Sequence, residues 1–253
     1  MVNATISGTG AGRSNDASRP RRGGRVVRVP ASVVLVALIG ALLGHGVAAV
    51  DQAFRSSTFS GPLPACGVDD VAAPHASLAE WGQTLLDTTY AIDRSYVPDD
   101  LTPTGEAGIT GGGSVRAFMI IDLEALGRAG RKAGQAISVG SAYRSFDAQA
   151  RTFASLVRAF SHDYALRSAA RPGHSEHQLG TTIDFVGGEA WLADNAWRFG
   201  FVMSYPPARS PALTCYRAEP WHFRYFGRSR AAEIESAGIS PREWLWQHAD
   251  DGR

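Results

Sequence analysis

Apolar side chains recur at helical spacing in three segments of the chain after residue 76. The first helix is predicted to begin at Ser77, where a Ser-x-x-Glu capping box precedes apolar residues Leu78, Trp81, Leu85 and Ile92. A second helix is predicted over residues 122–133, ending at Gly134. Ser145 caps a third, whose apolar face comprises Phe146, Phe153, Leu156, Val157, Phe160 and Tyr164.

Shorter apolar runs bounded by turn residues dominate the rest of the chain. They predict strands at residues 136–140, 181–186, 201–203 and 221–225. Helices are predicted over residues 190–199, ended by Gly200, and from Ser240, with Pro241 at the first helical position. Helices followed by short strands mixed with helices indicate an α+β domain, with a small, mostly antiparallel sheet and flanking helices.

The longest apolar run covers residues 29–50 and follows a basic segment. A basic flank before an apolar stretch is typical of an export signal or a membrane anchor. We therefore expect a disordered cytoplasmic tail at residues 1–28, the apolar segment at 29–50, a linker at 51–74 and a folded domain at 75–253. The arginines of the tail are Arg13, Arg19, Arg21, Arg22, Arg25 and Arg28.

The sequence leaves open whether this apolar segment is cleaved. The stretch 31–43 is short enough for a signal-peptide core, and Val47-Ala48-Ala49 resembles a small-residue cleavage site. The full run is also long enough to span a bilayer. The domain is expected outside the cytoplasm in either case, tethered to the membrane or secreted.

Composition narrows the class of protein. The chain has 253 residues, 44% of them hydrophobic, which supports one medium-sized domain and an extension. A formal net charge of +1 gives no basic field for nucleic acid. The glycine-rich stretch 105–113 reads as a loop; it lacks the strand–loop–helix context and the lysine of a phosphate-binding loop. No oligomer is indicated, and a monomer is expected.

Two histidine–carboxylate pairs form the candidate catalytic chemistry. His177 lies seven residues before Asp184, and Glu219 lies three residues before His222. Two imidazoles and one carboxylate are a suitable ligand set for catalytic zinc, with the fourth position left for water. His177, Asp184 and His222 are the predicted ligands on the sheet, and Glu219 is the candidate base. A turn at Pro220 would let Glu219 and His222 converge.

Spacing alone leaves each histidine open to a simpler interpretation, as a surface or hydrogen-bonded residue. Asp184 is more informative, because it lies within the apolar run Thr182–Val186. A carboxylate there is costly unless it is paired or bound to a metal. His174 is predicted to lie on the rim of the site and not to bind metal.

Three sequence blocks resemble the signature motifs of the VanY-type D-alanyl-D-alanine carboxypeptidases, the zinc D,D-carboxypeptidase family of vancomycin resistance. They are Ser141-Ala142-Tyr143-Arg144-Ser145-x-x-x-Gln149, Pro172-Gly173-x-Ser175-Glu176-His177-Gln178-x-Gly180 and Glu219-Pro220-Trp221-His222-Phe223-Arg224-Tyr225. The segment Asn195–Pro206 is similar to the family's connection between the second and third blocks. The resemblance covers the chain from about Ser77 onward.

The resemblance implies a role for each matching residue. His177, Asp184 and His222 match the zinc ligands, Glu219 matches the catalytic base, and Arg144 matches the arginine that meets the substrate and the developing oxyanion. Ser175 and Gln149 occupy motif positions that shape the pocket, and Tyr143 and Trp221 are predicted to contact substrate. The implied reaction is hydrolysis of the terminal D-Ala-D-Ala bond of a peptidoglycan stem peptide.

The resemblance is consistent with other functions as well, and the chain differs from the family's usual residues at some positions. A D,D-dipeptidase, an endopeptidase or a non-catalytic zinc-bearing wall-binding module would share the fold. Thr181-Thr182 replaces an apolar or small pair, and Ser204 stands where the family often has arginine; both are expected to affect substrate choice. Cys215 stands where glycine is common.

The chain has two cysteines, Cys66 and Cys215. In an extracytoplasmic protein an even number of cysteines indicates a disulfide, and we predict that these two are bonded. The alternative is a pair of unbonded, buried thiols.

Overall fold

The computed structural model describes residues 61–248. These residues belong to the compact unit Arg55–Arg253. The predicted cytoplasmic tail, the apolar segment 29–50 and residues 51–60 of the predicted linker lie outside the described residues. No helix within residues 61–248 combines the length and the apolar character needed to cross a membrane.

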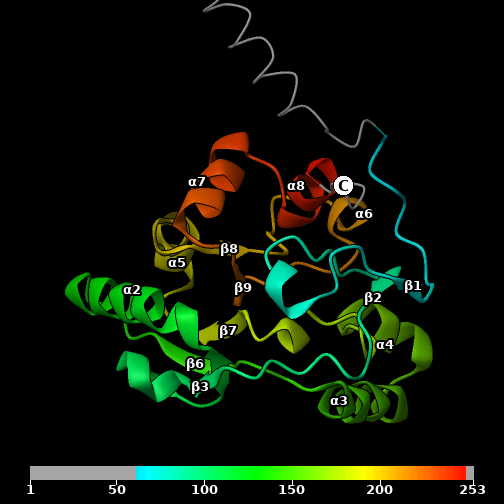
Figure 1. The fold of residues 1–253 in the computed structure, drawn as a ribbon, viewed down its shortest axis with the longest axis horizontal. Helices are drawn as coiled ribbons and strands as arrows, with labels where there is room; N and C mark the ends of the chain where they lie inside the picture. The colour runs from blue at the N-terminus through cyan, green and yellow to red at the C-terminus, as the bar shows by residue number, and fades with distance from the viewer. Residues whose placement is uncertain (1–60, 249–253) are drawn as a thin grey trace, which may run out of the picture. The chain divides into compact units, whose positions relative to one another are not determined.

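A five-stranded sheet forms the centre of the fold (Figure 1). Its order is β4 (Thr110–Gly111), β6 (Ser138–Ser141), β7 (Thr182–Val186), β9 (His222–Tyr225) and β8 (Phe201–Met203). The β4–β6 pair is parallel and the other three pairs are antiparallel. The predicted α+β class with a small, mostly antiparallel sheet is therefore confirmed.

Strand alternation divides the sheet into a core face and a polar face. On β7 and β9, the core side chains Ile183, Phe185, Phe223 and Tyr225 are buried in the main hydrophobic cluster. The intervening residues must point to the opposite face, because successive side chains of a strand alternate. Asp184 and His222 are such residues, and they are direct cross-strand partners.

Helices lie on both sides of the sheet (Figure 1). Leu123 and Leu126 of α2 (Ile120–Lys132) and Leu192 of α5 (Glu189–Asn195) pack into the core cluster. α3 (Phe146–Ala159) and α4 (His162–Ser168) lie together on the opposite side of the strands from α2 and α5 (Figure 1). The remaining helices are α6 (Pro211–Thr214), α7 (Arg228–Ala237) and α8 (Pro241–Gln247). Short 3-10 turns occupy Leu78–Glu80 (η1), Thr104–Ala107 (η2), Ala117–Met119 (η3), Glu176–Leu179 (η4) and Ala196–Phe199 (η5).

Local capping signals predicted several boundaries correctly. The Ser145 hydroxyl accepts a hydrogen bond from the Ala148 N–H and begins α3. Ser240 and Glu243 form a capping box at α8. Gly134 follows α2 in the left-handed region, at φ 74°. The third predicted helix is divided, however: α3 ends before Phe160, and Tyr164 lies on α4.

The helix predicted after Ser77 is wrong. The capping box is present, but it begins only the single turn η1. The Asp87 carboxylate then accepts hydrogen bonds from the backbone N–H groups of Thr89 and Tyr90. Such a side-chain turn competes with helical hydrogen bonding, and the chain continues as β2 (Tyr90–Ala91).

The glycine-rich stretch predicted as a loop carries short regular elements instead. It contains η2 and β4, and it lies between β3 (Leu101–Pro103) and β5 (Ser114–Arg116), which pair antiparallel. Gly111 has φ 106°, and a Cβ there would lie 2.0 Å from the Val139 carbonyl oxygen. Glycine is required at this position, because the edge strand approaches β6 so closely.

The predicted disulfide is present between Cys66 and Cys215, whose Cα atoms are 5.3 Å apart. Cys215 follows α6 in the left-handed region, at φ 65°, which accounts for the glycine common at this position in the family. β1 (Val71–Ala72) pairs with β2, and the Pro64 carbonyl accepts a hydrogen bond from Arg242. The end of the predicted linker therefore packs against the domain.

Candidate active site

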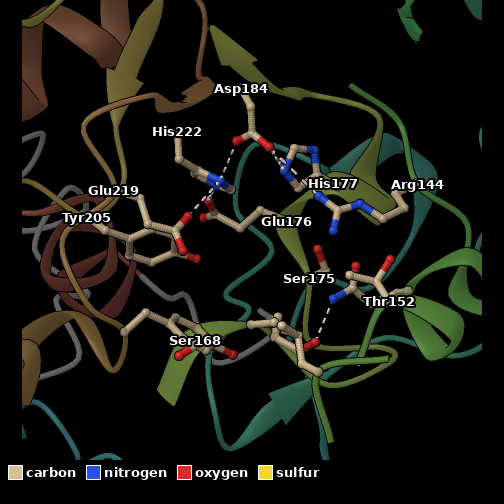
Figure 2. Close-up of a pocket in the computed structure, with 15 residues that line it drawn as sticks. Arg144, Thr152, Ser168, Ser175, Glu176, His177, Asp184, Tyr205, Glu219 and His222 are labelled. Carbon is tan, nitrogen blue, oxygen red and sulfur yellow. Dashed lines mark hydrogen bonds and ion pairs between the residues drawn. The ribbon is translucent and has the colours of Figure 1, made fainter. Parts of the chain in front are cut away.

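Three predicted ligands converge at the polar face of the sheet (Figure 2). Asp184 comes from the middle of β7, His222 begins β9, and His177 lies in η4 just before β7. Asp184 Oδ2 lies 3.2 Å from His177 Nε2, and Asp184 Oδ1 lies 3.1 Å from His222 Nδ1. One ligand atom from each residue lies within 4.8 Å of the other two, an arrangement that could hold a metal ion.

Hydrogen bonds fix which nitrogen of each imidazole faces this centre. His177 Nδ1 lies 2.7 Å from the Ala142 carbonyl oxygen, which can only accept, so Nδ1 carries the hydrogen. His222 Nε2 lies 3.0 Å from Glu176 Oε2 and donates to that carboxylate. The free nitrogens, His177 Nε2 and His222 Nδ1, therefore point at Asp184. This orientation of ligand histidines by outer partners is typical of metal sites.

The donor set suits a divalent cation. With those hydrogens assigned, two imidazole lone pairs and a carboxylate face one another, and Asp184 Oδ1 is buried without a hydrogen-bond donor. Burial opposes protonation of His222, but hydrogen bonds with Asp184 and Glu176 raise its pKa to about 10. The site thus strongly favours a positive charge. A bound metal ion would supply that charge while the imidazole nitrogens that face it stay unprotonated. Two histidines and one carboxylate fit zinc and leave a fourth position open.

Glu176 is a functional residue that the sequence analysis quoted but gave no role. Its side chain is buried and also contacts Arg224 Nη1 at 3.0 Å and the Ser204 hydroxyl at 2.6 Å. Burial opposes its ionisation, but the hydrogen bond from His222 and the charge of Arg224 lower its pKa to about 2. The sequence offered one signal for this role. Glu176 directly precedes the candidate ligand His177, and Arg224 lies two residues after the other candidate histidine, His222.

Glu219 lies beside the ligands in a position suited to a base. The predicted turn is present, since the His222 N–H donates to the Glu219 carbonyl, and the Glu219 N–H is held by the Tyr205 carbonyl at 2.9 Å. Glu219 Oε2 is 3.5 Å from His222 Nδ1. Burial raises the pKa of Glu219 above its ordinary value. A carboxylate in this position can take a proton from a water held at the centre and return it to a leaving group.

A cavity of about 190 Å³ opens onto the ligands and Glu219. Its lining includes the three predicted site residues Arg144, Gln149 and Ser175. Arg144 Nη2 lies 3.8 Å from Asp184 Oδ2, so its guanidinium faces the centre without a direct hydrogen bond to it. Gln149 is buried; its amide donates to the Ala170 carbonyl, and its Oε1 has no hydrogen-bond partner among residues 61–248. That oxygen is available to a ligand in the cavity.

Tyr205 and Tyr216 form a further wall of the cavity that the sequence analysis did not assign to the site. The Tyr205 ring lies 4.8 Å from the His222 imidazole and 5.2 Å from the Tyr216 ring, centroid to centroid. Tyr205 was visible in the sequence only as part of a Tyr-Pro pair, without a charge to mark it.

Two predicted substrate contacts do not line the cavity. Trp221 is 44% exposed, lies in the turn directly before β9 and is absent from the cavity lining. Tyr143 is likewise absent from the lining. His174 is not a rim residue, because it is fully buried against the Asp87 carbonyl and Asp70.

The two departures expected to affect substrate choice also lie outside the cavity. Thr181 and Thr182 are buried, and the Ser204 hydroxyl donates to Glu176. Ser204 thus acts on the residue behind His222, and any effect of these positions on substrate is indirect.

The sequence comparisons with known proteins agree on one family. The model of the VanY family, described as D-alanyl-D-alanine carboxypeptidase, matches residues 113–228. The putative carboxypeptidase YodJ of Bacillus subtilis (strain 168) is 30% identical over 198 residues, which cover 71% of this chain and 70% of that protein. D-alanyl-D-alanine carboxypeptidases of Enterococcus faecalis and Enterococcus faecium are 41% and 32% identical over 85 and 117 residues; these matches cover 30% and 42% of this chain and 31% and 35% of the two relatives.

Solved structures share the fold. A mutant of the vancomycin-resistance D,D-pentapeptidase VanY in complex with Zn(II) is 29% identical with a TM-score of 0.58, covering 65% of this chain and 99% of that chain. VanYB in complex with D-alanine-D-alanine is 28% identical with a TM-score of 0.59, covering 66% and 99%. The LD-carboxypeptidase LdcB is 27% identical with a TM-score of 0.59, covering 64% and 85%.

Proposed function

The chain belongs to the VanY family of D-alanyl-D-alanine carboxypeptidases, and on that premise we propose that it is a zinc enzyme that removes the terminal D-alanine of peptidoglycan stem peptides. The observation that carries this proposal is the convergence of His177, Asp184 and His222 within 4.8 Å, with Glu219 beside them. The VanY structure in complex with Zn(II) and the VanYB complex with D-alanine-D-alanine support the metal and the substrate class.

Each residue of the site has a chemical task in this reaction. His177 Nε2, His222 Nδ1 and the Asp184 carboxylate would hold the ion. When bound, zinc supplies the charge that lowers the pKa of a water to about 7 and polarises the scissile carbonyl. Glu219 takes the proton of the attacking water and returns it to the leaving amine. Arg144 lies in the same cavity and offsets negative charge on the carbonyl oxygen as the tetrahedral intermediate forms.

A second candidate reaction is L,D-carboxypeptidase activity, in which the last residue of a tetrapeptide stem is removed. It is favoured by LdcB, an LD-carboxypeptidase that is about as similar to this chain as VanYB is. The two activities share the terminal D-alanine and the residues around the metal. They differ in whether the residue before the scissile bond is D-alanine or the diamino acid of the stem.

The test is digestion of defined stem peptides by the purified zinc form, with products identified by mass. We expect loss of one alanine from the pentapeptide at the highest kcat/KM. A preference for the tetrapeptide would assign the L,D activity, and preferential hydrolysis of free D-alanyl-D-alanine, supplied beside the stems, would assign a dipeptidase. Internal cleavage would identify an endopeptidase. Binding without hydrolysis by zinc-loaded protein would identify a wall-binding module and contradict the proposal.

We further propose that the domain acts outside the cytoplasm. The basic segment before the apolar run 29–50 supports export, and the Cys66–Cys215 bond supports an oxidising compartment. Protease added to intact cells should degrade the domain if it is tethered, and the culture medium should contain it if the segment is cleaved. Protection of the domain in intact cells together with absence from the medium would contradict this location.

A further inference from the structure

The side of the cavity formed by α3 continues beyond the cavity to an exposed aromatic side chain. Gln149, Thr152 and Leu156 line the cavity from α3. The intervals of three and four residues place these three side chains on one helical face. Phe160 caps the end of α3 and donates its N–H to the Leu156 carbonyl, so it lies one turn beyond Leu156. Phe160 is 62% exposed. The stripe thus runs from a buried polar residue through an apolar one to an exposed ring.

The neighbouring helix repeats this arrangement. Ser168 of α4 lines the cavity, and Tyr164 lies one turn before it on the same face. The Phe160 and Tyr164 rings are 4.4 Å apart, centroid to centroid, and inclined by 31°. We call these two residues the aromatic platform. Figure 2 shows Thr152 and Ser168 across the cavity from Asp184 and His222, so the platform is reached from the side of the cavity away from the ligands.

The aromatic platform has the features of a ligand surface. The exposed ring of Phe160 is beside a half-buried tyrosine, and the Arg217 guanidinium lies 5.7 Å from the Tyr164 ring. Exposed apolar groups that continue a polar pocket are typical of an extended ligand groove. Phe118, another exposed aromatic residue, is instead stacked on Trp81 at 4.7 Å and continues no cavity lining.

The distance along α3 fits the length of the proposed substrate. Gln149 and Phe160 are eleven positions apart, about 16 Å along a helix. In a pentapeptide stem four residues separate the scissile bond from the sugar, which is about 14 Å of extended chain. A stem whose terminal alanine lies beside Glu219 therefore brings its sugar-linked end near the platform. The acidic groups of the stem complement Arg217.

We propose that the aromatic platform binds the amino sugar to which the stem peptide is attached, so that the protein prefers sugar-linked stems to free peptides. This inference rests on the proposed function. The sugar's apolar face packs on the Phe160 ring, while the stem follows the α3 face through Leu156 to the metal-binding residues. The contact lies beyond the reacting bond and acts on substrate selection.

The test compares N-acetylmuramyl-pentapeptide with the free pentapeptide on the same protein preparations. In Phe160→Ala the ratio of kcat/KM for the two substrates should fall about three- to tenfold, through KM for the sugar-linked one. Phe160→Trp should keep the ratio. Ile121→Ala, which removes an exposed apolar side chain from α2, is the matched control and should also keep it. Because both substrates meet the same protein, general destabilisation does not change the ratio.

Calorimetric titration with the corresponding tetrapeptides separates this inference from the proposed function. The parent protein should bind N-acetylmuramyl-tetrapeptide more tightly than the free tetrapeptide, and Phe160→Ala should abolish that difference. Equal binding of the two, or an unchanged kcat/KM ratio in Phe160→Ala, would overturn the platform. Tighter binding through Phe160 without hydrolysis of any stem would overturn the proposed function and leave the platform standing.

Discussion

Two clusters of charged groups in this domain each contain a buried histidine, and they differ in how their carboxylates are neutralised. One is the metal-site cluster of His177, Asp184 and His222. The other, which we call the anchor cluster, joins Asp87 to Arg242 and Asp70 to His174 and Arg171. Both contain a buried histidine from the same short segment, since His174 and His177 are three residues apart and each is nearly inaccessible to solvent.

In the anchor cluster each acid contacts an arginine directly. Asp87 Oδ2 is 2.7 Å from Arg242 Nε, and Asp70 Oδ1 is 2.5 Å from Arg171 Nη1. Asp184 has no such partner: its nearest arginine nitrogen in the described structure is 3.8 Å away, and two imidazoles face it instead. The buried carboxylate of Asp87 is neutralised by its arginine partner, and removing that partner would leave a buried charge uncompensated. A carboxylate faced by two imidazole lone pairs is instead a site for a cation.

Glu219→Ala is expected to have the largest effect among the variants that distinguish the metal site from the anchor cluster. Loss of the base should lower kcat by about 10²- to 10⁴-fold, while zinc content and thermal stability stay close to the parent, because Glu219 is not a ligand. Stem hydrolysis and metal analysis on the same sample check this. Glu124→Gln, which changes an exposed glutamate on α2, is the control. Activity within a few-fold of the parent would remove Glu219 from the mechanism.

Arg242→Ala should show the opposite behaviour. It leaves Asp87 charged and buried and frees the Leu213 and Pro64 carbonyls, so the free energy of unfolding should fall by about 3–5 kcal/mol. Zinc stoichiometry of the folded protein should not change. Arg128→Ala removes an exposed arginine paired with Glu124, and should cost less than about 1 kcal/mol. If Arg242→Ala lost zinc while keeping its stability, the division between the clusters would be wrong.

Breaking the Cys66–Cys215 disulfide should lower the free energy of unfolding of the domain. It closes a separation of 149 residues, and its removal should lower stability by about 2–5 kcal/mol. The left-handed backbone at Cys215 allows a sharper comparison. Cys66→Ala with Cys215→Gly should be about 1–2 kcal/mol more stable than Cys66→Ala with Cys215→Ala, because only glycine adopts that conformation without strain. Denaturant unfolding of both double variants measures the difference; equal stability would show that position 215 is unstrained.

The smallest expected effect concerns the orientation of His222. Glu176→Gln removes the carboxylate that accepts from His222 Nε2, and should weaken zinc binding by about 10- to 100-fold. Chelator competition on protein shown by circular dichroism to be folded measures the affinity. Ser204→Ala removes a neutral donor to the same carboxylate and should have a smaller effect in the same direction. Unchanged affinity in Glu176→Gln would show that the ligand needs no outer partner.

The sequence was sufficient wherever a local signal determined the structure. Capping residues located α3 and α8, because they act on neighbours close in sequence. The metal-site cluster was predicted from its resemblance to family motifs, since the spacing of histidines and acids left simpler interpretations open.

The sequence was insufficient where a long-range partner determined the structure. The capping box at Ser77 predicted a helix, but the turn at Asp87 is held by Arg242, 155 residues later. Glu176 showed no role until Arg224 and Ser204 were brought beside it. The candidate metal ligands and the candidate base were thus predictable as motifs, whereas their supporting partners depend on tertiary contacts.

Zinc content of the purified domain, measured beside its His222→Ala variant, tests the central claim most directly. The account predicts one zinc per chain in the parent protein and substoichiometric zinc in His222→Ala after the same dialysis, because two ligands cannot replace three. Arg242→Ala, measured in parallel, should keep its zinc while losing stability. Full zinc occupancy in a folded His222→Ala protein would contradict the assignment of the site.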